Sequence, residues 1–299
     1  MSGAHNPGSP TTRPAAQPRP RMPEPGTGPW LMGIVNVTPD SLSDGGRFLA
    51  TERAVAHGLE LCAAGPHILD VGGESTRPGA DPVSPAEQID RGCPGLAQLR
   101  RQSEVLLSVD TTRAEVARAA VAAGADWIND TSALDDDPEL AAVAAQAGTP
   151  VVLMHRPHPP RTMQDDPRYT VVVDEVVGWL EQRVARAQRA GIARDRIVLD
   201  PGIGFGKRLE HNLELMAAVR TLRARLGLPL LLGPSRKSFL GQLLGRPVDQ
   251  RLAGTAGAVA WLALAGVAVL RVHDVGFMAD VVRTALALRD RAQGAGGDA

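Results

Sequence analysis

Aromatic side chains are scarce in this chain of 299 residues and make up only 3% of it. With so few large rings, the hydrophobic core has to be built from Ala, Val, Leu and Ile. An excess of one charge is also missing, because the formal net charge is −1 at pH 7. Without a basic excess the chain has no overall attraction to nucleic acid or to an anionic membrane. Any site for an anion must therefore be local.

Cysteine is nearly absent as well, since Cys62 and Cys93 are the only two and no Cys-x-x-Cys or Cys/His cluster occurs. This disfavours both a disulfide framework and a structural zinc site. A reducing compartment, the cytoplasm, is then the simplest location. No apolar run approaches the roughly 20 residues of a membrane-spanning helix. The sequence thus predicts no membrane partner and no nucleic-acid partner.

The first 29 residues differ in composition from the rest, with eight prolines and three arginines among Gly, Ser and Thr. They contain no continuous apolar segment of the kind found in a secretory signal. Such a segment cannot bury enough surface to offset its ordering entropy. We therefore expect residues 1–29 to be a disordered tail, with a targeting or docking role as the alternative. Residues 30–292 are expected to form one domain, and residues 293–299 a frayed terminus.

One unit recurs along this domain: a helix-like, Ala-rich stretch, then a short apolar run that ends in a polar residue. The eight apolar runs are Leu31–Asn36, Ile68–Asp70, Val105–Asp110, Trp127–Asp130, Val151–His155, Ile197–Asp200, Leu230–Gly233 and Val267–Asp274. Apolar strands that alternate with helices indicate parallel strands buried on both faces. Eight of them in about 260 residues predict a (β/α)₈ TIM barrel. A doubly wound open sheet is the alternative.

Six of these runs end in Asn or Asp, and in a barrel all such ends meet at one mouth. Two of the segments that follow are unusually long, Met32–Gly46 and Asp70–Ala80, and are rich in Gly, Ser, Asp and Pro. Loops of this length in a compact domain are usually functional. The barrel mouth is therefore the predicted site.

These two segments resemble the signature sequences of the dihydropteroate synthase family. Further blocks match the family in order and spacing, and they are Ser108–Thr111, Ile128–Asp130, Leu153–His155, Leu199–Lys207, Gly233–Lys237 and Arg271–Asp274. The resemblance runs from about Leu31 to the last helix. It implies an enzyme that joins a pterin diphosphate to para-aminobenzoate and releases pyrophosphate.

The resemblance also implies which residues bind the pterin. A pterin ring has a donor-rich edge at its 2-amino group and N3, which carboxylates match, and acceptors at O4 and N5, which an ammonium matches. The family pattern gives the first task to Asp110, Asn129 and Asp200, and the second to Lys237. Asp110 and Asp200 could instead be helix caps or turn residues. The remaining members of the set are Met154 and Phe205, which would pack on the ring, and Gly233.

For the diphosphate, the resemblance implies Arg271 and His273, which alternation along a strand places on one face. Asn36 would take the diphosphate and its Mg²⁺. One amide oxygen is a weak ligand, so phosphate and water would hold most of the metal. The alternative for His273 is a core histidine whose hydrogen bonds are satisfied.

For para-aminobenzoate, the resemblance implies Ser235 together with Thr76 and Arg77 of the second long segment. We expect Ser235–Lys237 to open a helix, whose N-terminus favours a carboxylate. The sequence departs from the family at Leu42, where an aromatic Phe is usual. It also carries Gly92-Cys-Pro-Gly95 within the expected second helix, which predicts a late or kinked helix.

The mechanism implied is an SN1-like departure of pyrophosphate, with Asp110, Lys237, Arg271 and His273 as catalytic residues, followed by attack of the arylamine. The resemblance further implies a homodimer, for which the apolar segment Ala256–Ala265 is the candidate. Two other functions stay open. A corrinoid-type pterin methyltransferase shares the barrel and the Asp/Asn/Asp set but needs neither long loop. A non-catalytic pterin-binding paralogue would be favoured by loss of Arg77, Lys237 or His273, all of which are present.

Overall fold

The computed structural model describes residues 22–24, 26–37, 44–75 and 79–294. Eight parallel strands form one sheet, in the order β6-β5-β4-β3-β2-β1-β8-β7. The strands are β1 (Trp30–Asn36), β2 (Ile68–Gly72), β3 (Leu106–Asp110), β4 (Trp127–Asp130), β5 (Val151–Met154), β6 (Ile197–Asp200), β7 (Leu231–Leu232) and β8 (Val269–Val272). A parallel bridge between Leu199 and Leu230 joins the two outer strands. The predicted (β/α)₈ barrel is confirmed.

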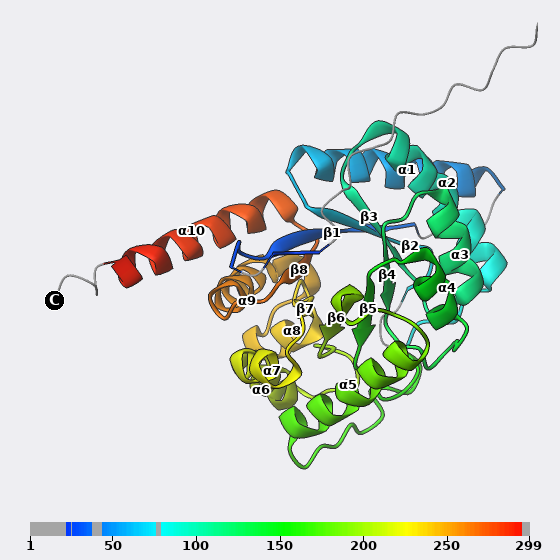
Figure 1. Ribbon diagram of the computed structural model, residues 1–299. Coiled ribbons are helices and arrows are strands. Elements are labelled where there is room, and N and C mark those ends of the chain that lie inside the picture. The colour runs from blue at the N-terminus through cyan, green and yellow to red at the C-terminus, as the bar shows by residue number, and fades with distance from the viewer. Residues whose placement is uncertain (1–21, 25, 38–43, 76–78, 295–299) are drawn as a thin grey trace, which may run out of the picture.

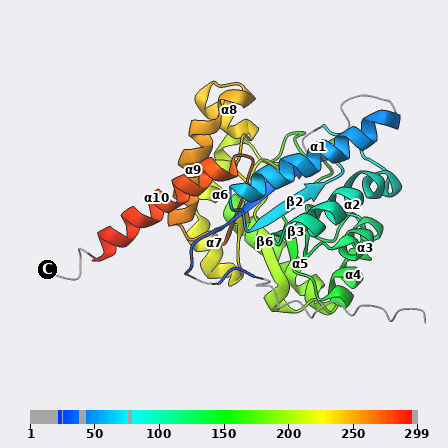
Figure 2. The same ribbon diagram turned by 90° about the horizontal axis from the view of Figure 1, so that it is seen from above.

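Helices surround this barrel on its outer side (Figure 1). They are α1 (Asp44–Ala63), α2 (Pro85–Gln102), α3 (Ala114–Ala123), α4 (Leu140–Ala147), α5 (Val172–Arg189), α6 (Leu209–Ala217), α7 (Val219–Leu226), α8 (Ser238–Leu244), α9 (Leu252–Leu264) and α10 (Val275–Gly294), with short 3₁₀ turns at Arg194–Arg196 and Val248–Gln250. The far end of α10 extends beyond the body of the barrel in both views (Figures 1 and 2). Within the described residues, no helix has the length and apolar character needed to cross a membrane.

The apolar core has two layers, because successive strand residues face opposite sides. One layer lies between the strands and the helices and includes Leu69, Leu107 and Leu199. The other fills the barrel itself, and its members are Trp30, Met32, Ile68, Leu106, Trp127, Val152, Val198, Leu231 and Val269. This inner layer closes the barrel below the carboxyl ends of the strands. Inward side chains further along each strand therefore lie above it.

The second helix begins earlier than expected from Gly92–Gly95, which predict a late or kinked helix. α2 starts at Pro85, with the Ser84 hydroxyl accepting a hydrogen bond from the N–H of Glu87, and it continues through Pro94 to Gln102. The expected late start is wrong, and packing explains why. α2 lies between α1 and α3, and the side chain of Leu99 is 1% exposed. Tertiary burial outweighs the local cost of Gly and Pro here.

Candidate functional site

Strand alternation brings most of the predicted site residues together. Asn129, Met154, Asp200 and Arg271 each stand two positions after a member of the inner apolar layer, and Asp110 stands four positions after one. Their side chains therefore project into the barrel from five different strands, above an apolar floor. All but Arg271 are buried, with exposed fractions of 6% or less. The barrel interior at this level is thus polar, as predicted.

A charged cluster occupies one side of this level. The guanidinium of Arg271 donates from Nε to Oδ2 of Asp70 at 2.7 Å and from Nη2 to Oδ2 of Asp110 at 3.1 Å. Burial, and then the neighbouring Asp70 carboxylate, raises the pKa of Asp110 to about 7, although Arg271 opposes the rise. Oδ1 of Asp110 has no hydrogen-bond partner within the described protein. A buried acceptor of this kind needs a donor, and a ligand with N–H groups would supply one.

Sequence reasoning missed Asp70 as a site residue. It is fully buried, and besides Arg271 it accepts a hydrogen bond from Nδ2 of Asn129 at 2.9 Å. The available signal was its position, because Asp70 ends the apolar run of β2 as Asp110 ends that of β3. The residue that pairs with Asp70 in the ladder is Ser108, two positions before Asp110. Both carboxylates therefore point into the same interior.

Lys237 lies on the opposite side, beside Asp200 and Phe205. Its Nζ lies 4.4 Å from the centre of the Phe205 ring and donates to the carbonyl of Ile203. Burial lowers the pKa of Lys237 to about 8, and Asp200 opposes that shift. Burial also raises the pKa of Asp200, although Lys237 and a hydrogen bond from the N–H of Gly202 oppose this. The predicted grouping of Lys237, Asp200 and Phe205 is therefore found in the structure.

The segment between β6 and α6, residues 201–208, is held in place by side chains from several elements. Its consecutive carbonyls, from residue 203 to 206, each accept a side-chain hydrogen bond. The donors are Lys237, Gln164, Lys207 and Tyr169. Gly204 has φ +84°, and a Cβ there would lie 2.8 Å from Cδ of Lys237, so the segment needs glycine at this point. Phe205 is therefore presented on a rigid turn.

Lys207 is the most buried of these donors, at 4% exposed, and sequence reasoning did not single it out. Its Nζ contacts Nδ1 of His155 at 2.9 Å and the carbonyl of Phe205 at 3.0 Å. Burial lowers the pKa of Lys207 to about 7, with Asp200 opposing. Burial and Lys207 together hold the pKa of His155 well below its usual value. Both residues belong to the matched sequence blocks, which is the only signal that the sequence carries for them.

Ser235 lies elsewhere than expected. Helix α8 begins at Ser238, with Lys237 as its N-cap, so the prediction that Ser235–Lys237 opens this helix is displaced by three residues. Ser235 is instead buried, and its Oγ lies 2.9 Å from Nδ1 of His273. The Gly233-Pro234 turn precedes it, and the side chain of Arg271 would lie 3.5 Å from a Cβ at Gly233. This is an ordinary van der Waals separation, so Gly233 lies directly beside Arg271.

Asn36 is exposed at the end of β1, next to Gly72 of β2. Among the residues that the structure describes, no group of three or more His, Cys, Asp or Glu side chains could hold a metal ion. One amide oxygen fits only a metal that brings most of its own ligands. The donor set is therefore compatible with Mg²⁺ carried by a diphosphate.

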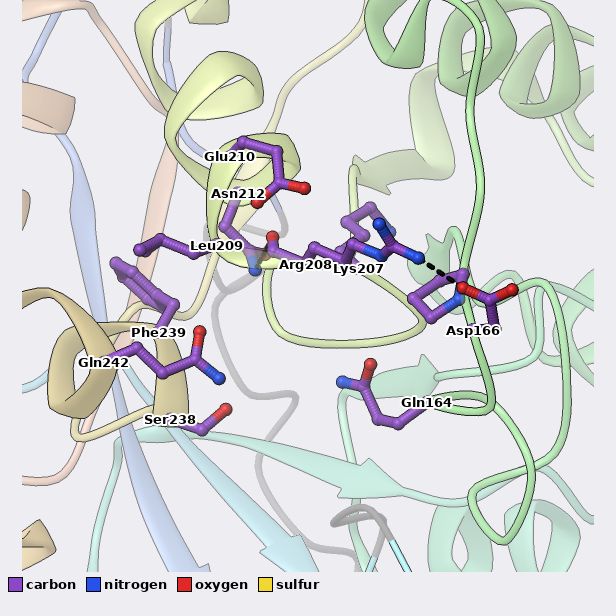
Figure 3. A pocket seen from close by; sticks show the side chains of 11 residues that line it. Gln164, Asp166, Lys207, Arg208, Leu209, Glu210, Asn212, Ser238, Phe239 and Gln242 are labelled. Atoms are coloured by element: carbon purple, nitrogen blue, oxygen red, sulfur yellow. Dashed lines mark hydrogen bonds and ion pairs between the residues drawn. The ribbon is translucent and has the colours of Figure 1, made fainter.

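A hollow of about 540 Å³ adjoins the Phe205 turn. Figure 3 shows its walls, with Ser238 and Gln242 of α8 on one side, Gln164 and Asp166 on another, and Arg208 reaching toward Asp166. Arg208 is paired with Asp166 at its rim. The hollow does not include Asp110 or Asn129, but it touches Lys207 and Ser238, the neighbours in sequence of Gly206 and Lys237. It forms a chamber between the Phe205 turn and the start of α8.

Three predicted positions lie outside the described residues, namely Thr76, Arg77 and Leu42. Most of the predicted tail, residues 1–21, and the terminal residues 295–299 do so as well. These predictions stay predictions.

Comparison with known proteins gives a consistent answer. The family described as "Pterin binding enzyme" matches residues 32–273. The dihydropteroate synthase of Synechocystis sp. is 45% identical over 260 residues, which cover 87% of this chain and 90% of that protein. The structure is similar to that of Xanthomonas albilineans dihydropteroate synthase with 4-aminobenzoic acid, with a TM-score of 0.82 and 46% identity over 88% of this chain and 94% of that one. A structure of the Xanthomonas albilineans synthase in complex with 7,8-dihydropteroate matches with a TM-score of 0.78 and 43% identity over 88% of this chain and 94% of that one.

Proposed function

This chain belongs to the family of pterin binding enzymes, as a dihydropteroate synthase, and from that membership we propose how its own residues carry the reaction. The protein is a transferase of folate biosynthesis. It condenses 6-hydroxymethyl-7,8-dihydropterin diphosphate with para-aminobenzoate to give 7,8-dihydropteroate and pyrophosphate. The observation that carries the residue assignment is the set of buried acceptors at the carboxyl ends of β3, β4 and β6.

The pterin ring binds on the polar level of the barrel. Asp110, Asn129 and Asp200 present oxygen atoms there, and the ring's 2-amino and N3 edge offers the matching donors. The unpartnered Oδ1 of Asp110 supports this assignment, because a ligand donor would satisfy it. Lys237 leaves the Ile203 carbonyl to reach O4 and N5, and Phe205 and Met154 pack on the ring.

The diphosphate lies toward Arg271 and His273. Arg271 uses Nε and Nη2 for its two carboxylates, and Nη1 keeps both of its hydrogens for a phosphate oxygen. His273 follows Arg271 by two residues, and its Nδ1 contacts the hydroxyl of Ser235. Mg²⁺ would be held by the diphosphate, by water and by Asn36, and when bound it would neutralise charge on the leaving group.

Para-aminobenzoate occupies the chamber of Figure 3, between the Phe205 turn and α8. Its amine must meet the pterin methylene carbon, so its pocket has to adjoin the pterin. Lys207 lines this chamber and donates to the carbonyl of Phe205, which supports the assignment. Ser238 opens α8 and lines the chamber, which supports it as the hydroxyl that meets the carboxylate. Ser235, bonded to His273, then serves the diphosphate side instead. Thr76 and Arg77 would complete this pocket.

The chemistry is departure of pyrophosphate followed by attack of the neutral arylamine. The bond between the pterin methylene carbon and the diphosphate oxygen breaks first, and its electron pair leaves with pyrophosphate. Positive charge then spreads over the pterin, and the ionised carboxylate of Asp110 stabilises it. Arg271 and His273 stabilise the departing anion. The arylamine attacks the cationic carbon and afterwards loses a proton to solvent.

The decisive test is pyrophosphate release from the pterin diphosphate, measured with and without para-aminobenzoate. We expect release and formation of 7,8-dihydropteroate in equal amounts when both substrates are present. The Lys237→Met variant, which keeps the apolar stem and removes the ammonium, should bind pterin weakly and release little. Tight pterin binding by the wild-type protein without any condensation would instead indicate the non-catalytic paralogue.

The proposal includes a homodimer and a cytoplasmic location. Trp261 and Leu264 of α9 and Phe277 of α10 are exposed by 36–53%, and α9 packs against α10. Exposed apolar side chains on adjacent helices support a contact between two copies there. Sedimentation of wild type and of Phe277→Glu would test it, with a shift toward monomer expected in the variant. The two cysteines are free thiols, which supports a reducing compartment.

A further inference from the structure

The mechanism above gives no direct task to Asp70, although it is a fully buried carboxylate beside the pterin level. Its Oδ2 accepts two hydrogen bonds at once, from Nε of Arg271 at 2.7 Å and from Nδ2 of Asn129 at 2.9 Å. Its Oδ1 has no partner among the described residues. Asp70 has no exposed surface, and its two side-chain contacts within the described residues are to Arg271 and Asn129. It acts through these two side chains.

The hydrogen bond between Asn129 and Asp70 fixes which way the Asn129 amide points. A planar amide carries a donor at one end and an acceptor at the other. Because Nδ2 points at Asp70, Oδ1 of Asn129 must point away from it. Rotating the amide by half a turn would place its oxygen against the Asp70 carboxylate, so that two acceptors would face each other without a hydrogen between them. Such a mismatch costs a buried group its hydrogen bond.

We propose that Asp70 is a positioning residue that fixes the orientation of the Asn129 amide, and so makes this pocket select a pterin with a 2-amino group. With Asp70 in place, Asn129 offers an oxygen to the ligand, in line with the carboxylates of Asp110 and Asp200. All three then accept, and the ligand edge has to donate. The inference rests on the proposed function, because it assumes that the pterin edge lies against Asn129.

The chain supplies a matched control in Asp130, which is also a fully buried aspartate at a strand end. Its carboxylate accepts from the N–H and hydroxyl of Ser132 and from the N–H of Leu134. These contacts hold the turn after β4 and involve no ligand-facing side chain. Substitution at Asp130 therefore measures the effect of destabilising the end of β4, and it leaves the hydrogen bond between Asn129 and Asp70 in place.

The experiment compares two free ligands by calorimetry on the full chain. One is 6-hydroxymethylpterin, and the other is the lumazine analogue, in which a 2-oxo group replaces the 2-amino donor. We expect wild type to prefer the pterin by at least about 100-fold, as sites built to hydrogen-bond a substrate edge do. In Asp70→Asn, the new amide can donate to Oδ1 of Asn129 and permit the rotated state. The preference of the protein for the pterin over the lumazine should then narrow by up to about 10-fold, which corresponds to the loss of one hydrogen bond.

The ratio of the pterin affinity to the lumazine affinity distinguishes a positioning role of Asp70 from a general loss of structure. A shift of Arg271 in Asp70→Asn would weaken both ligands alike, since neither carries a phosphate. An unchanged ratio, whatever the absolute affinities, would overturn the inference and leave the proposed function standing. Equal narrowing in Asp130→Asn would overturn it too. Wild type that binds neither ligand would overturn the proposed function, and this inference with it.

If Asp70→Asn fails to fold, neutron diffraction of the wild-type protein with 6-hydroxymethylpterin decides the matter, because it locates the amide hydrogens. The inference requires a hydrogen of Nδ2 on Asp70 and the Asn129 oxygen on the 2-amino group. The reversed amide would refute it.

Discussion

Arg271 is the counter-charge for two buried carboxylates. Replacing it with methionine should therefore lower the free energy of unfolding, because both carboxylates would stay buried without a cation. Arg271→Met keeps an unbranched apolar stem of similar reach and removes the guanidinium. Asp70 and Asp110 would then face each other without a cation between them. Breaking a buried ion pair by removing one partner typically costs about 3–5 kcal/mol of unfolding free energy. We expect a loss in this range near neutral pH.

The loss should depend on pH in a defined direction. The folded-state pKa of Asp110 is raised from 3.8 to about 7. A raised pKa means that its stabilising contribution is complete below the unfolded value and is lost as pH rises through the folded one. One pKa unit corresponds to about 1.4 kcal/mol, so wild type should lose roughly 4 kcal/mol from this group between pH 4 and pH 7. Without Arg271, which opposes the rise, the pKa of Asp110 moves higher still, and stability keeps falling above pH 7.

Urea unfolding of wild type and Arg271→Met at pH 5 and pH 9 measures this effect. The difference between the two proteins should be smaller at pH 5, where Asp110 is protonated in both and the variant lacks only the pairing of Arg271 with Asp70. It should grow at pH 9 by about 1.4 kcal/mol for each unit that the pKa gains. Arg236→Met is the control, because Arg236 pairs with Asp274 near the surface, where an ion pair contributes about 1 kcal/mol or less. An Arg271→Met penalty that is equal at both pH values would refute the reasoning.

Four further outcomes are expected. Asp200→Asn should leave the fold intact, because the amide oxygen can still accept from the N–H of Gly202, but it should reduce synthesis by roughly 10⁴-fold, and near-normal turnover would remove Asp200 from the pterin site. His273→Ala should weaken the pterin diphosphate by about 10–150-fold in calorimetry and the free pterin alcohol far less, whereas equal losses would assign His273 a structural role. Tyr169→Phe frees the carbonyl of Gly206 and should raise the KM for para-aminobenzoate about 5-fold with little change in kcat, and a fall confined to kcat would contradict the rigid-turn argument. Leu42→Phe, at a position outside the described residues, should lower the KM for para-aminobenzoate and, more strongly, the inhibition constant of sulfonamides, because an aromatic pair contributes about 0.5–1.5 kcal/mol. Steady-state kinetics that leave the ratio of these two constants unchanged would mean that position 42 only packs within its loop.

Much of the site can be located from the order of residues. Alternation along a strand is a local property, so residues two or four positions after an inward apolar side chain also face inward. This rule places Asp110, Asn129 and Asp200 inside the barrel, and the contacts of Asp110 with Arg271 and of Asn129 with Asp70 agree with it. The same rule places Asp70 there, but the family resemblance assigns that residue no role, so only its contacts reveal it.

Local propensity fails where packing opposes it. Gly92 and Pro94 predict a late or kinked second helix, and the late start is wrong because α2 begins at Pro85 and includes both residues. Burial of its apolar face between α1 and α3 outweighs a propensity cost of about 1 kcal/mol for Gly and about 3 kcal/mol for Pro. The start of α8 differs by three residues from its expected position for a related reason. Ser235 is buried and contacts His273, and the helix begins three residues after it.

The barrel, the level of the polar side chains and, through the matched blocks, the family can all be read from the order of residues. They follow from period-two alternation and from the repeated strand-and-helix unit, which are encoded over a few residues at a time. Which side chains meet is a property of the folded chain alone. Arg271 binds an aspartate 201 positions away, and the Phe205 turn is held by donors from other segments, among them Gln164, Tyr169 and Lys237. Contacts over such separations depend on how the strands close into a barrel, and no local pattern specifies them.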